Sequence, residues 1–318
     1  MNKKIICLSH THWDREWYLT KESFGMMLID LVDRVLSILQ PDEEFVCFML
    51  DGQTIALEDY LNFRPDRRVE IAQLVRQGKL IIGPWYILPD EYLLSGEGHI
   101  RNYLIGQDIC SSFGGSMQHG YLPDSFGHPS QMPQILQGLG LTDAFFWRGL
   151  GKDITTTEFY WEGADGSRVL AINMPYSYGI GACLPEDPET LNKRFAMAIK
   201  RLEPLTAGNV LLFMQGVDHV APDPKLPDKL KTVSRSLTDY DVIQGSLDTY
   251  MELVDPARIT ETAHGELRSG YRAYLLGGTL STRGYLKQKA FETERCLTAY
   301  AEPLAVLAHL YGSVPVPA

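Results

Sequence analysis

In three places the sequence sets metal-binding or acid–base side chains directly after a short apolar run. His12 and Asp14 follow the run I-I-C-L at 5–8. Alternate residues at a strand end point to the same side, so this H-x-D pair can present an imidazole and a carboxylate to one metal ion. Asp124, in Y-L-P-D-S-F-G-H, would add a carboxylate from another strand end. Zinc is the first expectation for such ligands, with cobalt or manganese as alternatives. From the spacing alone, a histidine that caps a helix is an equally good interpretation.

Asp124 and Asp218 form a candidate pair of catalytic carboxylates. Glycoside hydrolysis uses one carboxylate to attack the sugar or activate water and a second to protonate the leaving oxygen. Asp218 lies in Q-G-V-D-H after an apolar run, where partial burial would raise its pKa toward that of a general acid. Taken alone, Asp218 is better explained as a helix N-cap ahead of A-P-D-P-K.

Aromatic side chains accompany these polar motifs. The flat apolar face and single N–H of tryptophan suit the C–H face of a sugar ring as well as a protein core. For any one of these residues, core packing is the more frequent explanation. Their joint placement beside the polar motifs favours a sugar site. They are Trp13, Trp17, Trp85, Tyr86, Phe126 and Trp147.

The elements that must position these side chains alternate between strands and helices. This alternation predicts parallel strands covered by helices, in an α/β layered or barrel-like domain. The carboxyl ends of such strands gather functional groups. Two β-rich runs around A-D-G-S predict a hairpin within Phe159–Asn173. The expected strands are Lys4–Leu8, Glu44–Leu50, Lys79–Tyr86, His119–Leu122, Ala144–Trp147 and Val210–Met214. The expected helices are Glu22–Leu39, Ala56–Phe63, Arg67–Gln77, Gly98–Phe113, Ser130–Gly138 and Pro188–Leu202.

Composition narrows the function classes. The 318 residues carry 29 Lys+Arg against 40 Asp+Glu, a net charge of −11 that argues against nucleic-acid binding. No stretch approaches the roughly 20 apolar residues of a membrane helix, so no membrane partner is expected. The five cysteines are scattered, and two lie in apolar runs as reduced thiols would. We therefore expect a cytoplasmic protein.

Five motifs in matching order resemble the family 38 glycoside hydrolases, the retaining α-mannosidases, and most closely their bacterial branch of α-mannosidases and mannosylglycerate hydrolases. They are H-T-H-W-D-R-E-W-Y, G-K-L-I-I-G-P-W-Y, G-Y-L-P-D-S-F-G-H, F-F-W-R-G and S-T-R-G-Y-L-K-Q. The resemblance implies a seven-stranded, mostly parallel, distorted barrel-like α/β catalytic domain over residues 1–258. It also implies that 259–318 form a linker and the first helix of a truncated helical domain. The sequence pattern places a long helix at 277–310, capped by Ser281 or Thr282.

Site roles follow from the resemblance residue by residue. His12, Asp14 and Asp124 match zinc ligands, and Asp124 also matches the nucleophile. Asp218 falls at the position of the acid/base. Trp17 and Phe126 match aromatics that line the mannose subsite, and Arg148 matches an arginine near the nucleophile. The residues expected to contact an α-mannoside, a small-molecule carbohydrate, are Trp17, Phe126, Arg148, Asp51 and Tyr178. Arg148 would keep Asp124 ionised. The implied reaction is a double displacement that retains configuration.

One implied ligand has no counterpart in the sequence. The family's fourth zinc ligand is a histidine in an H-D-S-I-G-like segment, and neither His264 nor His309 fits that motif. We therefore expect an incomplete fragment with weak zinc binding and little activity. A metal-dependent carbohydrate deacetylase or amidohydrolase and a non-catalytic carbohydrate-binding domain are the alternative functions. Glycan α-mannosides and mannosylglycerate are both open as substrates, and the full-length protein could be a homo-oligomer.

Overall fold

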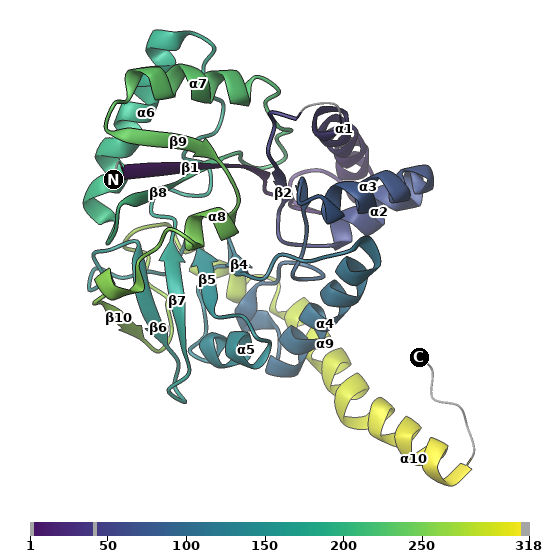
Figure 1. Ribbon diagram of the computed structural model, residues 1–318. Coiled ribbons are helices and arrows are strands. Elements are labelled where there is room, and N and C mark those ends of the chain that lie inside the picture. The colour runs from purple at the N-terminus through teal and green to yellow at the C-terminus, as the bar shows by residue number, and fades with distance from the viewer. Residues whose placement is uncertain (1–2, 41–42, 313–318) are drawn as a thin grey trace.

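Two five-stranded sheets form the centre of the protein (Figure 1). The computed structural model describes residues 3–40 and 43–312. The first sheet has the order β3-β2-β1-β8, with β9 pairing along another part of β1, and the second has the order β10-β6-β7-β5-β4. The strands are β1 (Lys3–Thr11), β2 (Phe48–Leu50), β3 (Leu80–Ile81), β4 (Gly120–Leu122), β5 (Asp143–Phe146), β6 (Glu158–Glu162), β7 (Arg168–Asn173), β8 (Val210–Gln215), β9 (Tyr240–Gln244) and β10 (Thr262–His264).

Helices cover the outer faces of both sheets. In Figure 1, α6 and α7 lie above the first sheet, α1–α3 lie beside it, and α5 lies against the second sheet. The short helix α8 contacts both β1 and β8. The α-helices are α1 (Lys21–Leu39), α2 (Ile55–Phe63), α3 (Arg68–Arg76), α4 (Gly96–Phe113), α5 (Met132–Gly138), α6 (Pro188–Leu202), α7 (Leu226–Ser236), α8 (Leu247–Met251), α9 (Gly284–Cys296) and α10 (Glu302–Gly312).

Both faces of the second sheet are buried, each in its own apolar core. Phe145 belongs to the core that also contains the residues of β1 and β8, whereas its neighbour Phe146 belongs to the core beneath α5. Successive side chains of a strand point to opposite faces, so adjacent phenylalanines serve different cores. Burial on both faces is typical of parallel strands and explains the continuous apolar runs in the sequence.

The predicted α/β class with mostly parallel strands is confirmed. Among the described residues, seven of the eight strand pairings are parallel. The antiparallel pair is β6 with β7, the hairpin expected around A-D-G-S. The strands expected at 44–50 and 79–86 are shorter than predicted. In the second, Pro84 has no N–H to extend the ladder, and Trp85 forms only an isolated bridge with Gln53.

The sequence patterns missed β9, β10, α7 and α8. The strand β9 pairs with β1, and β10 with β6, across long sequence separations. β10 also lies beyond the predicted domain boundary at residue 258, so the second sheet uses residues from the predicted linker. The boundary itself stays a prediction.

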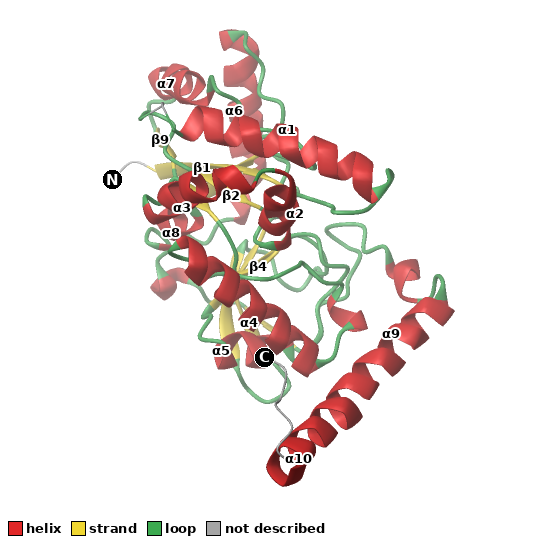
Figure 2. Ribbon diagram, turned by 90° about the vertical axis from the view of Figure 1, so that its right-hand side faces the viewer, coloured by secondary structure: helices red, strands yellow, loops and turns green. Residues whose placement is uncertain are grey.

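The predicted long C-terminal helix consists of α9, a π-helical turn at Leu297–Ala301 and α10. Figure 2 shows it extending away from the two sheets. Its predicted cap is wrong, because α9 begins after Arg283, which has a left-handed φ of 51°. The hydroxyls of Ser281 and Thr282 instead donate to the backbone oxygen of Gly278. Residues 313–318, the end of the segment 259–318 predicted as linker and first helix, lie outside the described residues. Among the described helices, none is long and apolar enough to span a membrane.

His119 joins the two sheets through two carboxylates. Its Nδ1 lies 2.7 Å from Asp143 Oδ2 on β5, and its Nε2 lies 3.2 Å from Asp248 Oδ1 on α8. Burial disfavours the charged ring, but the two carboxylates outweigh this effect and raise the pKa of His119 to about 9. Because α8 packs on β1 and β8, the charged ring ties the second sheet to the first.

We predict that His119→Gln lowers stability in a pH-dependent manner. A histidine whose pKa is raised from 6.5 to about 9 on folding contributes its full stabilisation below pH 6.5 and loses it as pH rises through 9. The contribution is roughly 2–3 kcal/mol, so the variant should have a lower Tm at pH 6 and approach the original chain above pH 9.

Thermal unfolding followed by circular dichroism across pH 5.5–9.5 measures this difference. His264→Gln is the matched control, because the His264 side chain is 67% exposed. A difference in Tm between His119→Gln and the original chain that does not change with pH would contradict the assignment.

Candidate active site

The candidate site lies at the carboxyl ends of β1 and β8, which run side by side. Ser9 pairs with Gln215 in the last part of the ladder, and His12 forms a further isolated bridge with Asp218. Gly216 permits this approach, because a Cβ there would lie 1.9 Å from the backbone oxygen of His10. The parallel pairing therefore brings the predicted imidazole and the predicted acid/base to neighbouring positions.

The His12 ring is held by a hydrogen bond to Asp51, the residue directly after β2. His12 Nδ1 lies 2.9 Å from Asp51 Oδ1, so Nδ1–H donates to the carboxylate and Nε2 faces the open side. Asp51 Oδ2 accepts from the backbone N–H of Trp13 at 2.6 Å and from Gln53 Nε2 at 2.9 Å. Asp51 was predicted to contact the substrate, but its side chain is fully buried and cannot reach a bound sugar. Asp51 instead orients His12, as carboxylates commonly do for metal-binding histidines.

The surroundings of His12 are strongly negative. Burial disfavours a charged ring, but Asp51 outweighs this effect, with smaller contributions from Asp14 and Asp124, and raises the pKa of His12 to about 10. The same negative field that holds a proton on Nε2 also favours a cation at that position.

Three carboxylates approach the open side of His12. Nε2 lies 3.7 Å from Asp14 Oδ1 and 4.0 Å from Asp124 Oδ2. Among the described residues, one group of metal-ligating side chains has all its ligand atoms within 4.8 Å of one another, and it consists of His12, Asp14 and Asp218. His12 and Asp14 thus match the predicted metal set, while the third carboxylate of the compact group is Asp218 instead of Asp124.

Asp124 is paired with Arg148 beyond β5. Arg148 Nε donates to Asp124 Oδ1 at 2.5 Å, and its guanidinium carbon lies 3.9 Å from the centre of the Trp147 ring. Burial raises the pKa of Asp124 above its ordinary value, while the Arg148 hydrogen bond and the His12 ring act against this rise. The ion pair thus limits the cost of burying the carboxylate and fixes one of its oxygens, leaving the other toward His12.

Tyr178 lies behind Asp218. Its hydroxyl donates to Asp218 Oδ1 at 3.0 Å, and its ring centre lies 4.8 Å from that of His12. Burial raises the pKa of Tyr178 far above its ordinary value, and the neighbouring Asp124 and Asp218 carboxylates add to this rise. The hydroxyl therefore stays protonated and orients Asp218.

A cavity of about 350 Å³ opens at His12, Asp14 and Asp124, whereas Asp218, Arg148 and Tyr178 are not among the residues that line it. This volume lies in the range of small-ligand pockets, roughly 300–1,000 Å³. Phe126 is in its wall, whereas Trp17, the other aromatic residue expected to contact the sugar, is 64% exposed and is not among the residues that line the cavity. The lining residues are His12, Trp13, Asp14, Arg15, Glu16, Gln53, Ile87, Leu88, Pro89, Asp90, Pro123, Asp124, Ser125 and Phe126.

Two polar residues of this cavity received no role from the sequence. Gln53 lies in D-G-Q after a predicted strand, and Asp90 lies in P-D-E, a stretch placed where substrate contacts are expected. Their positions at strand ends were the available signal, but no spacing connected them to His12. The role of Gln53 depends on hydrogen bonds that only the fold reveals, such as the one from its Nε2 to the backbone oxygen of Trp13.

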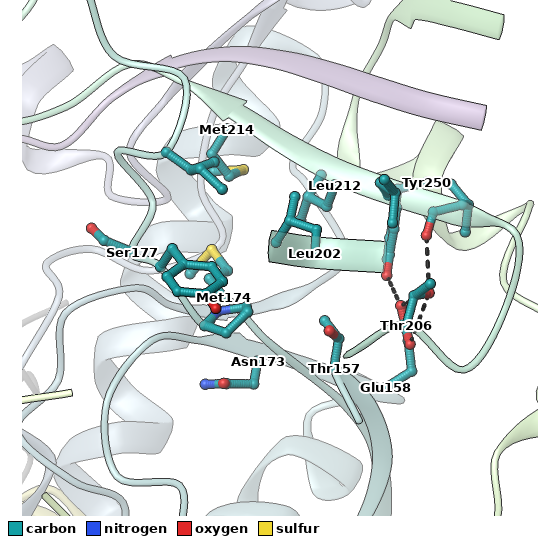
Figure 3. A pocket seen from close by; sticks show the side chains of 15 residues that line it. Thr157, Glu158, Asn173, Met174, Ser177, Leu202, Thr206, Leu212, Met214 and Tyr250 are labelled. Atoms are coloured by element: carbon teal, nitrogen blue, oxygen red, sulfur yellow. Dashed lines mark hydrogen bonds between the residues drawn. The ribbon is translucent and has the colours of Figure 1, made fainter. Parts of the chain in front are cut away.

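A second cavity, beside β8, is structural (Figure 3). Its volume of about 20 Å³ has room for about one water molecule and none for a sugar. The buried Glu158 accepts hydrogen bonds there from Thr206 at 3.1 Å and from Tyr250. These bonds compensate the burial of the carboxylate, so the cavity needs no ligand to explain its polar residue.

Comparison with known proteins relates the chain to one family. Residues 2–266 match the model of the glycosyl hydrolases family 38 N-terminal domain. A Halalkalibacterium halodurans protein provisionally named mannosylglycerate hydrolase is 34% identical over 96% of this chain and 36% of its own length. An alpha-mannosidase structure from Enterococcus faecalis is 37% identical, with a TM-score of 0.92 over 98% of this chain and 36% of that chain. Human alpha-mannosidase 2C1 is 29% identical over 73% of this chain and 22% of its own length. The chain thus spans about a third or less of the length of these relatives.

We predict that Asp51→Asn weakens the fold around His12. Asparagine tolerates the left-handed φ of 47° at this position, but its amide cannot replace a carboxylate that accepts from three donors. The free energy of unfolding should fall by about 1–3 kcal/mol.

Urea unfolding measures this loss, with Asp66→Asn as a control because the Asp66 side chain is 70% exposed. Equal stability of Asp51→Asn and Asp66→Asn would show that Asp51 does not support the site.

Proposed function

The chain belongs to glycosyl hydrolase family 38, and we propose that it carries the catalytic machinery of a zinc-dependent retaining α-mannosidase. The observation that carries the proposal is the arrangement around His12, where the carboxylates of Asp14, Asp124 and Asp218 converge beside one cavity. Because the chain spans about a third of the length of the relatives, the activity of the whole protein is part of this proposal.

The reaction is assigned to Asp124 and Asp218. Asp124 attacks the anomeric carbon, and Asp218 protonates the departing glycosidic oxygen. Asp218 then takes a proton from the water that releases the sugar from Asp124, so the product retains its configuration. Arg148 holds one oxygen of Asp124, which leaves the other available for attack. Tyr178 donates to Oδ1 of Asp218, which leaves Oδ2 to carry the transferred proton.

The donor set around His12 fits a zinc ion. His12 presents Nε2 toward the cavity, its other nitrogen is fixed by Asp51, and carboxylate oxygens lie nearby. We propose His12, Asp14 and Asp124 as the ligands. When bound, zinc would polarise and anchor two neighbouring sugar hydroxyls. Three protein ligands with a fourth position open to water or substrate is the arrangement of catalytic zinc sites.

We predict that a fluorinated mannoside traps a covalent adduct on Asp124. The fluorine slows hydrolysis of the glycosyl-enzyme, so intact-protein and peptide mass spectrometry should find the added sugar on Asp124. Asp124→Asn should form no adduct, and its turnover of α-mannosides should fall by at least about 10³-fold.

Asp30→Asn, a change at a side chain that is 77% exposed, is the control and should trap the sugar normally. Metal-dependent mannoside turnover without any adduct would contradict double displacement. Release of acetate from an acetylated sugar would instead support a deacetylase.

We predict that the two catalytic carboxylates differ in their effect on zinc affinity. Asp124→Asn should weaken zinc binding about 10-fold or more, because it removes a ligand. Asp218→Asn should change the affinity by less than about 3-fold if Asp218 is reserved for proton transfer.

Isothermal titration with zinc measures both affinities. The reverse order, with Asp218→Asn as the more damaging change, would make Asp218 the third ligand and contradict its role as acid/base.

A further inference from the structure

His219, the residue after Asp218, has a ring enclosed by aromatic side chains. Its side chain is only 4% exposed, and its backbone has a left-handed φ of 59°. The ring centre lies 4.9 Å from that of Trp13 and 4.8 Å from that of Phe24. On the solvent side, the rings of Tyr18 and Trp17 lie 5.9 Å and 6.4 Å away.

The hydrogen bonds of His219 reach two other parts of the site. Its Nε2 accepts from the backbone N–H of Asp14 at 3.2 Å, and its own backbone N–H donates to the backbone oxygen of His12 at 2.8 Å. A nitrogen that accepts a hydrogen bond carries no proton, so the ring proton is on Nδ1. Nδ1 lies 3.4 Å from the hydroxyl of Tyr18, which places a long hydrogen bond from Nδ1–H to that oxygen.

We propose that His219 is a positioning residue that fixes the backbone of Asp14 and the loop of Trp17 and Tyr18 relative to the turn that carries Asp218. This inference rests on the proposed function, in which Asp14 binds the metal and Asp218 transfers the proton, so that their relative positions affect the reaction. Asp14 Oδ1 lies 3.7 Å from His12 Nε2, and a shift of the Asp14 backbone would change that distance. Trp17 and Tyr18 are more than half exposed, and the rings of both lie against the His219 ring.

A purely space-filling role does not explain the ring nitrogens. Phenylalanine would fill the same aromatic enclosure, but it would leave the N–H of Asp14 without its partner. Histidine is also among the residues that tolerate a left-handed backbone better than most. The polar edge of the ring is therefore the part that connects Asp14 with the loop.

The test compares His219→Phe, which keeps the ring contacts, with His219→Gln, which keeps a side-chain acceptor. Zinc alone is the probe in calorimetric titration. His219→Phe should weaken zinc binding about 10-fold or more, as changes next to metal ligands commonly do. His219→Gln should recover most of the affinity, and the exposed His264→Phe should bind zinc as the original chain does. Circular dichroism at the same temperature confirms that each variant is folded.

A metal-free measurement separates this inference from the proposed function. Two-bond ¹H–¹⁵N NMR of the zinc-free chain should find the His219 proton on Nδ1, and His219→Phe should shift the Asp14 amide signal. A proton on Nε2, or an unchanged Asp14 signal, would overturn the positioning role. If the original chain binds no zinc but the NMR results are as expected, the metal assignment fails and the positioning role stands. Equal zinc affinity of His219→Phe and the original chain would overturn the role of the ring nitrogens.

Discussion

The site depends on one hydrogen bond, from His12 Nδ1 to the buried carboxylate of Asp51. A charged group this deep in the fold is stable only when its hydrogen-bonding capacity is used, and Asp51 uses both oxygens on His12, Trp13 and Gln53. The bond fixes the plane of the imidazole and leaves Nε2 as the nitrogen that faces the cavity. Every carboxylate of the candidate site is arranged around that nitrogen.

The two sheets supply these groups from opposite sides. The first sheet brings His12 and Asp218 together because β1 and β8 are parallel neighbours. The second sheet brings Asp124 and Arg148 together because β4 and β5 are parallel neighbours in register. Parallel strands end at the same edge, so each sheet contributes one of the two proposed catalytic carboxylates, each with its own polar partner. The two carboxylates therefore have different surroundings, with a guanidinium at Asp124 and a phenol at Asp218.

The sequence contained most of this chemistry but little of its geometry. Apolar runs followed by His12, Asp124 and Asp218 were enough to predict the α/β class and the strand ends that carry the site. Asp51 was expected to contact the substrate, but an acid at a strand end gives no sign of whether it faces the cavity or a neighbouring residue such as His12. The partners of His219 and the strands β9 and β10 depend on pairings between distant segments, which local periodicity does not encode.

We propose that the open nitrogen of His12 and nearby carboxylate oxygens form one metal site. X-ray absorption at the zinc edge of the zinc-loaded chain identifies the atoms of that site. We expect one imidazole together with oxygen ligands at about 2.0–2.2 Å. A first shell that contains sulfur at about 2.3 Å, or one without any imidazole, would contradict the claim.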